Sequence, residues 1–230
     1  MDKQIVITNL SKVYHQANSQ EVKALNNVNL EINKGESVSV MGVSGSGKTT
    51  LLNCIGLLDD YSEGEIIIDN QDVATFTDKE AREFRKNNFG YITQDYKLIL
   101  NNTVYANVMF PLIFSNKYKN NKERSKRVHN VINMVGLNLK DKNKIKDLSL
   151  SDKERVAIAR AIVNDPEIIL ADEPTDTLDS NNKLQIMNIY ERLYEEGKTI
   201  IIVTHDHEIA RLMKSTYYMI DGSINKCKLL

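Results

Sequence analysis

The sequence predicts an α/β fold with a mainly parallel central sheet, a small N-terminal antiparallel sheet and an inserted helical subdomain. Two continuous apolar runs, 167–171 and 199–203, are typical of central parallel strands that are buried on both faces. The segment 180–195 between them has a helical pattern, which gives the strand–helix–strand order of a parallel sheet. A further strand pattern, 37–41, leads into a glycine-rich loop and a helix, and the stretch from about 95 to 163 is helical.

One domain is expected, because 230 residues suffice for one sizeable α/β unit with a subdomain. We place its core in residues 1–94 and 164–230 and the helical subdomain at about 95–163. The hydrophobic content of 41% and the charged content of 27% are ordinary for a globular protein. The formal net charge is -1, so no overall basic field points to nucleic acid as a partner.

Cysteine usage and hydropathy limit the compartment. The two cysteines, Cys54 and Cys227, lie outside any CxxC or Cys/His cluster, so we expect neither a disulfide framework nor a zinc site, and a reducing compartment fits. The polar N-terminal residues do not resemble a signal peptide. The longest apolar run, 109–114, is too short to span a bilayer. We therefore expect a soluble chain that another polypeptide holds if it works at a membrane.

The N-terminal third is expected to supply the antiparallel sheet. Strands are predicted at 4–10, 28–33 and 65–69, and residues 16–21 are predicted to form a polar loop. The alternation of apolar and polar residues at 28–33 gives that strand one solvated face.

Helix signals occur at three places between the strand patterns. Thr77 is the expected N-cap of a short charged helix. One helix is predicted at 103–114, interrupted by Pro111. Another is predicted at 122–135, with Gly136 as its C-cap.

The loop 42–50 carries the strongest chemical signal in the chain. It lies between the strand pattern 37–41 and the apolar helix pattern 51–58, which is the context that a phosphate-binding P-loop requires. A chance glycine turn before a helix is the simpler alternative, and these flanks make it a poor explanation. In a P-loop NTPase core, Lys48 reaches the β- and γ-phosphates of a nucleotide and the Thr49 hydroxyl coordinates Mg²⁺. The residues expected to contact the nucleotide here are Gly42, Ser44, Gly45, Ser46, Gly47, Lys48, Thr49 and Thr50.

Polar side chains end two of the predicted parallel strands. Asp172 and Glu173 follow the apolar run 168–171, at the edge where a parallel sheet binds its ligand. Asp172 fits the role of holding Mg²⁺, and Glu173 can orient or deprotonate the attacking water. The structural alternative for these acids is a solvated turn. His205 follows the other buried strand and is placed to contact the γ-phosphate, although a lone histidine at a strand end is more often structural.

Gln94 and Tyr14 are weaker candidates for contact with a nucleotide. Gln94 ends the strand predicted at 89–93 and begins the helical stretch, which places it to sense the γ-phosphate through Mg²⁺. Tyr14 precedes the first loop and can stack on adenine, a contact worth roughly 1–3 kcal/mol. Ordinary packing at a strand end is the alternative for Tyr14.

Taken together, these motifs resemble those of the nucleotide-binding subunit of an ABC transporter, over almost the whole chain. The pattern is most similar to the branch that contains the lipoprotein-release, macrolide-export and antimicrobial-peptide-resistance ATPases. The motifs occur in the family's order: Tyr14, the loop 42–50, Gln94, the strand end 168–173, the D-loop 176–179 and His205.

The resemblance implies ATP and Mg²⁺ as cofactors and ATP hydrolysis as the reaction. It implies an integral membrane permease as a partner, which would contact the residues after Gln94 and the helical subdomain. It also implies a second ATP-binding subunit, in a homodimer or a heterodimer, and no nucleic acid. The expected location is the cytoplasm, peripherally at the inner face of the cell membrane.

One motif departs from the family. The family's signature is normally Leu-Ser-Gly-Gly-Gln and faces the γ-phosphate of ATP held by the other subunit, whereas residues 148–152 are Leu-Ser-Leu-Ser-Asp. Leu150 and Ser151 add Cβ atoms where close approach of the backbone is needed. Asp152 adds a negative charge, and at ~6 Å and an effective dielectric constant of about 20 its repulsion of a phosphate would reach ~3 kcal/mol before screening.

Other features near the signature are ordinary or retained. Ser149 can still donate a hydrogen bond, and the spacing from Ser151 to Glu154 predicts a capping box and a stable, shifted helix start. The lysines of the loop 138–146 are expected to be solvated surface. In the D-loop, Asp176 stands where a small residue is usual. The residues expected to act on the ATP of the other subunit are Ser149, Leu150, Ser151, Asp152 and Asp179.

Three functions follow from these observations. The first is an ATP-binding and hydrolysing subunit that powers or gates the permease of an ABC transporter of the exporter or mechanotransmission type, with turnover reduced by the altered signature. The alternative is a regulatory module that dimerises with ATP and hydrolyses little, against which the retained Glu173 argues. The third is a soluble, non-transport ATPase acting on ribosomes or DNA. Such family members usually carry two cassettes or long insertions, which these 230 residues do not contain.

Overall fold

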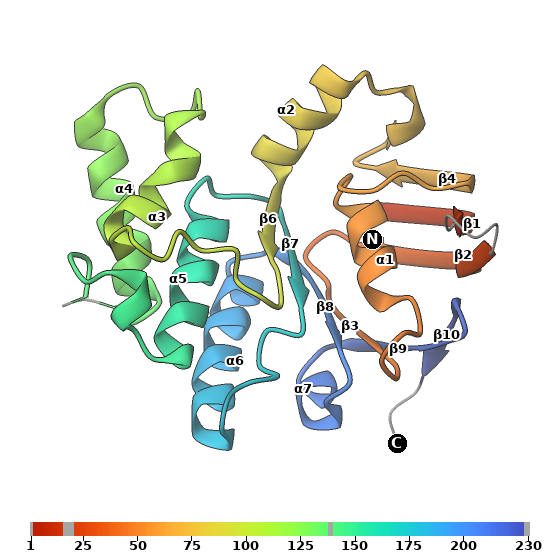
Figure 1. The fold of residues 1–230 in the computed structure, drawn as a ribbon. Helices are drawn as coiled ribbons and strands as arrows, with labels where there is room; N and C mark the ends of the chain where they lie inside the picture. The colour runs from red at the N-terminus through yellow and green to blue at the C-terminus, as the bar shows by residue number, and fades with distance from the viewer. Residues whose placement is uncertain (1, 16–20, 138–139, 228–230) are drawn as a thin grey trace.

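The computed structural model describes residues 2–15, 21–137 and 140–227, which fold around two β-sheets (Figure 1). The larger sheet has the strand order β10-β9-β3-β8-β7-β6. All its neighbouring strands pair in parallel except β10, which is antiparallel to β9. In chain order the strands are β3 (Ser37–Met41), β6 (Phe89–Ile92), β7 (Ile168–Asp172), β8 (Thr199–Thr204), β9 (Ser215–Ile220) and β10 (Ser223–Cys227).

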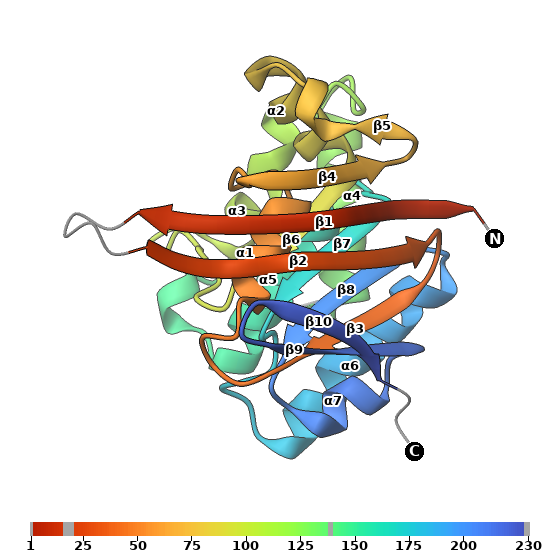
Figure 2. The ribbon, with the colours of Figure 1, turned by 90° about the vertical axis from the view of Figure 1, so that its right-hand side faces the viewer.

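The smaller sheet is antiparallel and has the strand order β2-β1-β4-β5. Figure 2 shows β1, β2 and β4 running across one flank of the molecule, with the hairpin of β9 and β10 below them. The predicted combination of a mainly parallel sheet and a small N-terminal antiparallel sheet is thereby confirmed. The strands of the smaller sheet are β1 (Lys3–His15), β2 (Glu21–Asn33), β4 (Glu63–Ile68) and β5 (Gln71–Asp72).

Strands β1 and β2 are longer than the strands predicted at 4–10 and 28–33, since their pairing continues to His15 and Glu21. Residues 16–20 of the predicted loop lie outside the described residues. The sequence pattern missed the extensions because bulges shift the register of the pairing at several points and break the period of two. The first residues of β2 are also exposed on both sides, so no apolar face marks them as strand.

Seven α-helices accompany the sheets in the part of the chain that the structure describes. Helix α1 packs against β2, β7 and β8, and α3, α4 and α5 lie together at the opposite end of the molecule (Figure 1). None of the helices within the described ranges has the length and apolar composition needed to cross a bilayer. The helices are α1 (Lys48–Ile55), α2 (Asp78–Asn88), α3 (Val104–Ile113), α4 (Asn121–Met134), α5 (Leu150–Ile162), α6 (Ser180–Glu195) and α7 (His207–Arg211), with short 3-10 turns η1 (Val73–Thr75) and η2 (Ile145–Asp147).

One predicted helix cap is confirmed, and two predicted details differ from the structure. Thr77 is the N-cap of α2, and it exchanges hydrogen bonds with Glu80 in a capping box. The C-cap of α4 is Val135 rather than the predicted Gly136, which follows it with a φ of 79°, a left-handed conformation that favours glycine. The predicted interruption at Pro111 is wrong, because α3 continues past it. Pro111 lies in the last turn, where its missing N–H removes only one backbone hydrogen bond.

Buried side chains form two hydrophobic clusters, on opposite faces of the larger sheet. Ile169 and Ala171 of β7 belong to the cluster that contains α3, α4, α5 and α6. Ile168 and Leu170 of the same strand belong to the cluster with α1 and the smaller sheet. Burial on both faces explains why β7 is apolar at every position before its final aspartate.

Candidate functional site

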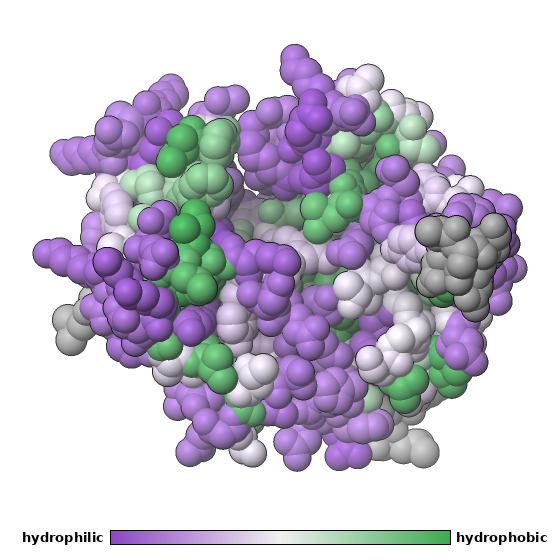
Figure 3. All heavy atoms as spheres, viewed as in Figure 1, coloured by the Kyte–Doolittle hydropathy of each residue, from purple (hydrophilic) through white to green (hydrophobic). Residues whose placement is uncertain are grey.

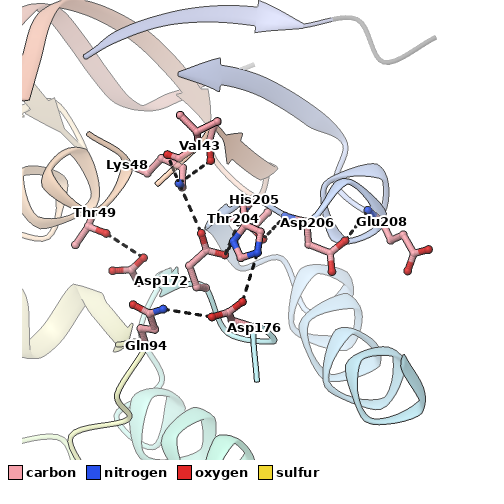
Figure 4. A network of polar contacts seen from close by, with 12 residues as sticks. Val43, Lys48, Thr49, Gln94, Asp172, Asp176, Thr204, His205, Asp206 and Glu208 are labelled. Carbon is pink, nitrogen blue, oxygen red and sulfur yellow. Dashed lines mark hydrogen bonds and ion pairs between the residues drawn. The ribbon is translucent and has the colours of Figure 1, made fainter. Parts of the chain in front are cut away.

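Three loops meet where the parallel strands β3, β7 and β8 end. The pairing of Met41 with Thr204, and of Asp172 with Val203, aligns the carboxyl ends of these strands at one edge of the sheet. The glycine-rich loop after β3 therefore faces the acids at the end of β7 and the histidine after β8 (Figure 4). Ligands of parallel α/β sheets bind at such an edge.

Glycine is required at two positions of the loop 42–50. Gly47 is the N-cap of α1 and has a φ of 105°, and a Cβ added there would collide with the carbonyl oxygen of Ala24. A Cβ added at Gly42 would collide with the carbonyl oxygen of Met219. The buried hydroxyl of Ser46 has no hydrogen-bond partner among the described residues, and a phosphate oxygen would supply one.

The turn between β9 and β10 braces this loop from the side of the smaller sheet. The N–H of Gly222 donates to the carbonyl oxygen of Ser46 at 3.0 Å. The carbonyl oxygen of Gly222 in turn accepts from the N–H of Asn26 on β2 at 2.9 Å. One residue of the last hairpin thereby joins the loop to the antiparallel sheet.

The ammonium group of Lys48 lies at the centre of the site. It donates to the carbonyl oxygens of Gly42 at 2.7 Å and of Val43 at 3.1 Å, and it lies 3.6 Å from Oε1 of Glu173. The Lys48 side chain is buried, so its charge acts through a medium of lower dielectric constant than water. A phosphate group entering the loop is therefore strongly attracted to it.

Thr49 and Asp172 supply oxygen atoms suited to a magnesium ion. The Thr49 hydroxyl donates to Oδ1 of Asp172 at 3.2 Å. Burial raises the pKa of Asp172, the hydrogen bond from Thr49 opposes this shift, and the charge of Glu173 adds to it. A hydroxyl and a carboxylate are ligands that Mg²⁺ accepts, with phosphate oxygens and water completing its shell. Thr49 and Asp172 alone would not enclose a metal ion. The described residues contain no group of three or more His, Cys, Asp or Glu side chains that could do so.

Glu173 is held in position by its backbone and by His205. Its φ is 47°, a costly left-handed conformation for glutamate, and its N–H donates to the carbonyl oxygen of Val203 at 2.9 Å. Oε2 of Glu173 lies 3.1 Å from Nδ1 of His205 and accepts a hydrogen bond from the His205 N–H at 3.2 Å. The carboxylate therefore lies between the Lys48 ammonium and the imidazole, where it can orient or deprotonate a water molecule.

Asp176 lies between Gln94 and His205 and contacts both side chains (Figure 4). Nε2 of Gln94 donates to Oδ2 of Asp176 at 3.4 Å, and Nε2 of His205 lies 3.4 Å from Oδ1. From the sequence, Asp176 was only a departure from the usual D-loop, with no predicted role. Its position three residues after Glu173, within one turn, was the available signal.

Most of the predicted nucleotide-binding residues line one cavity of about 610 Å³. Val22, Lys23 and Ala24 of β2 also line the cavity, and they were not predicted because they lie in the unpredicted extension of that strand. Gly42, Ser46 and Asp172 are buried behind the lining. The predicted residues that line the cavity are Ser44, Gly45, Gly47, Lys48, Thr49, Thr50, Gln94, Glu173 and His205.

Tyr14 lies outside the lining of this cavity. Its hydroxyl donates to Oδ2 of Asp59 at 2.5 Å, and the Lys12 ammonium lies 4.9 Å from the centre of its ring. Burial and the hydrogen bond to Asp59 raise the pKa of Tyr14, and the hydroxyl of Thr50 opposes the shift. Tyr14 therefore adjoins a residue that lines the cavity, and its stacking on adenine stays a prediction.

Comparison with known proteins agrees with this geometry. The model of the ABC transporter family matches residues 25–176, more than half of the chain. The sequence is 43% identical over 227 residues to the uncharacterised ABC transporter ATP-binding protein MJ0796 of Methanocaldococcus jannaschii, with 96% of this chain and 95% of that protein covered. This chain belongs to the ABC transporter family. It is one of the family's ATP-binding proteins and an ATPase, as the motifs predicted.

Further relatives of this ABC ATPase fall in the predicted branch. The lipoprotein-releasing system ATP-binding protein LolD of Bacteroides thetaiotaomicron is 39% identical, with 89% of this chain and 94% of that protein covered. The macrolide export ATP-binding/permease protein MacB of Shewanella sp. is 38% identical over 91% of this chain, which spans 32% of that longer protein. A dimeric structure of MJ0796 in a post-hydrolysis state, bound to ADP and Pi, matches with a TM-score of 0.91 at 41% identity and covers 98% of this chain and 99% of its own.

The altered signature of the ABC ATPase lies at the start of α5. Ser149 is the N-cap, and its hydroxyl oxygen accepts from the N–H of Asp152 at 3.2 Å. The predicted capping box from Ser151 to Glu154 is wrong, because Ser149 already caps the helix and Glu154 is buried in the core. The helix therefore begins directly after Ser149 rather than at a shifted position.

The charge of Asp152 is paired, which corrects the expectation of a free negative charge at the signature. Its Oδ2 accepts a hydrogen bond from the Lys140 ammonium at 2.6 Å and from the Ser149 hydroxyl at 2.8 Å. Although burial opposes it, these two contacts hold the pKa of Asp152 below its ordinary value. Lys140 belongs to the loop 138–146, whose lysines were expected to be solvated surface. Residues 138–139 of that loop lie outside the described residues.

The predicted residues of the opposing half-site line a second cavity, of about 700 Å³. The D-loop residue Asp179 is the N-cap of α6 and accepts from the N–H of Asn182 at 3.0 Å. No lining residue is shared with the nucleotide cavity in the described structure. All the predicted residues of this half-site line it: Ser149, Leu150, Ser151, Asp152 and Asp179.

Proposed function

We propose that this ABC ATPase powers or gates an integral membrane permease by hydrolysing Mg²⁺–ATP bound at the loop 42–50. The observation that carries the proposal is the convergence of Lys48, Glu173 and His205 around one cavity, with Gln94 at its edge. Relatives named as parts of lipoprotein-releasing and macrolide export systems support a transport role of the exporter or mechanotransmission type. The dimeric structures of MJ0796 support a second ATP-binding subunit as partner.

The contacts of each side chain suggest its role. Lys48 exchanges the loop carbonyls for β- and γ-phosphate oxygens. Thr49 and Asp172 hold Mg²⁺, which when bound neutralises charge on the phosphates. Glu173 orients or deprotonates the attacking water, and His205 fixes the Glu173 carboxylate from 3.1 Å away.

The first test measures hydrolysis by the purified chain. Glu173→Gln removes the carboxylate that orients or deprotonates the water, so kcat should fall at least about 100-fold. ATP binding should be retained, because the loop 42–50 is unchanged and the substitution removes a negative charge that lies 3.6 Å from the Lys48 ammonium. Single-turnover rates that are equal in the parent chain and the variant would instead favour the regulatory module.

The membrane partner is proposed to dock on residues 95–163, the predicted helical subdomain. Hydrophobic side chains are exposed on and before α3, and Figure 3 shows green surface over this part of the molecule. Phe110 and Phe114 are 47% and 59% exposed, and their rings contact each other edge to face with centroids 5.5 Å apart. An exposed apolar group of this kind favours contact with a partner. The other members of this group are Ile99, Leu100 and Ile113.

The docking proposal predicts loss of membrane association. Changing Phe110 and Phe114 together to Ser should move the chain from the membrane fraction of its own cells to the cytoplasm, while the ATPase activity of the purified chain is kept. Leu212→Ser is the control, because Leu212 is also exposed but follows α7. Membrane association unchanged by the double substitution would contradict docking on this face and the proposed location at the inner face of the membrane.

We further propose that turnover is slow where this chain supplies the signature. Leu150 and Ser151 place side chains at the first turn of α5, where the family has glycines. Restoring the family's residues with Leu150→Gly, Ser151→Gly and Asp152→Gln should raise the ATPase rate of a homodimer, and an unchanged rate would refute the idea. In a heterodimer with an intact signature opposite, the P-loop of this chain would hydrolyse ATP and the other site would mostly hold it.

A further inference from the structure

We propose that Lys140 is a positioning residue for the ATP that a second copy of this chain holds at its P-loop. The Lys140 ammonium neutralises Asp152, the carboxylate that stands in place of the signature glutamine. This inference rests on the proposed function, since it requires two chains to pair around ATP.

The contacts of Lys140 are specific to the altered signature. Its Nζ lies 2.6 Å from Oδ2 of Asp152, the same oxygen that accepts the Ser149 hydroxyl at 2.8 Å. The Asp152 side chain is only 16% exposed, and that of Lys140 is 43% exposed. Both side chains line the cavity that contains the half-site residues. The ion pair therefore lies on the surface that the opposing ATP would meet.

The stability of helix α5 does not explain why Lys140 contacts Asp152. An acid in the first turn of a helix is already stabilised by the free N–H groups and the helix dipole, and Asp152 also accepts from Ser149. A partly exposed ion pair adds little to the stability of a fold. For an approaching phosphate, however, an unpaired Asp152 would be repulsive. With Lys140 in contact, the pair has no net charge and the N-terminus of α5 can attract an anion.

Arg155, the other cation beside Asp152, is committed elsewhere. Its guanidinium donates to the carbonyl oxygen of Val135 at 2.6 Å and to Oε1 of Gln185 at 2.6 Å. Within the described residues, the ion pair with Asp152 is made by Lys140. The direct contact that neutralises the carboxylate is therefore made by Lys140, and Arg155 acts on it only from a distance.

A double-mutant cycle tests the proposal. In chains that carry Glu173→Gln, so that bound ATP persists, the dissociation constant of the ATP-dependent homodimer is measured by analytical ultracentrifugation. Lys140→Ala should weaken this dimer about tenfold. Once Asp152→Asn has removed the carboxylate that holds the Lys140 ammonium at 2.6 Å, this flexible side chain returns to solvent, so the same change should have less than about a twofold effect. Lys140→Arg should retain the parent affinity, because it restores the cation.

Lys142→Ala is the matched control. Lys142 lies in the same loop, is exposed and makes no ion pair with another described residue, so its loss should leave dimerisation within about twofold of the parent. An equal effect of Lys140→Ala with and without Asp152, or no effect in the Glu173→Gln chain, would overturn the inference about Lys140 and leave the proposed ATPase function untouched. If the Glu173→Gln chain binds a fluorescent ATP analogue but neither it nor any further variant dimerises, the proposed self-pairing is wrong and the inference about Lys140 is wrong with it.

Discussion

Replacing Glu154 with glutamine should stabilise the protein at neutral pH and leave its stability nearly unchanged near pH 4.5. Glu154 lies on α5, is fully buried, and neither carboxylate oxygen has a hydrogen-bond partner among the described residues. Burial raises the pKa of Glu154 well above its ordinary value of 4.5. Tyr190 on α6 is equally buried, and both burial and the proximity of Glu154 raise the pKa of its hydroxyl.

The sign and size of the effect follow from proton linkage. Below pH 4.5 the Glu154 carboxyl is protonated in both the folded and the unfolded chain, so its stability contribution is complete there. As the pH rises, the unfolded chain loses this proton first, and the free energy of unfolding falls by about 1.4 kcal/mol per pH unit until the folded pKa is reached. The loss therefore accumulates over the whole interval from pH 4.5 up to the raised folded pKa. Glutamine does not titrate, so Glu154→Gln escapes this loss.

Urea unfolding at a series of pH values from 4.5 to 8 measures this difference. The advantage of Glu154→Gln over the parent chain should be absent near pH 4.5 and should grow as the pH rises toward the folded pKa. Glu191→Gln on α6 is the matched control, because Glu191 is exposed and its replacement should give no pH-dependent gain. A difference between Glu154→Gln and the parent chain that does not change with pH would refute the reasoning.

Three further predictions concern the nucleotide site and helix α2. Asp176→Asn should lower the KM for ATP roughly fivefold, because about 1 kcal/mol of repulsion between the carboxylate and the triphosphate is removed. Steady-state ATPase assays measure the KM, and an unchanged value would contradict the prediction. Thr77→Ala should lower the Tm by about 2–4 °C in a circular dichroism melt, since loss of an N-cap costs about 1 kcal/mol. An unchanged Tm would show that the capping box contributes nothing. Gly47→Ala should abolish binding of a fluorescent ATP analogue, because its Cβ collides with the carbonyl oxygen of Ala24. Gly197→Ala is the control for backbone strain, because Gly197 has a φ of 85° and open space around it. This variant should bind the ATP analogue normally.

The fold could be predicted wherever burial or backbone conformation leaves a local pattern in the sequence. Ile169 and Leu170 are adjacent and pack into opposite clusters, so an unbroken apolar run revealed a central strand. The P-loop was predictable because positions such as Gly47 admit no side chain. The outer halves of β1 and β2 were not predictable, since bulges and exposure on both sides remove the alternation that marks a strand.

The candidate site was predictable in its residues but not in their partners. Lys48 and Glu173 were expected to act together because each ends or begins an element at the same sheet edge. The contacts of Asp176 with Gln94, and of Lys140 with Asp152, join separate segments through side chains alone. Such pairs leave no period in the sequence, and only the three-dimensional arrangement reveals them.

The hydrogen bonds of Gly222 have a consequence for the order in which the protein matures during its synthesis. Ser46 emerges from the ribosome long before Gly222, yet the backbone of Ser46 depends on that residue for one of its hydrogen bonds. Strand β2 is tied to the same residue through Asn26. A nascent chain that ends before residue 222 therefore lacks both hydrogen bonds, and the link between its P-loop and strand β2 forms only when the last hairpin has been made.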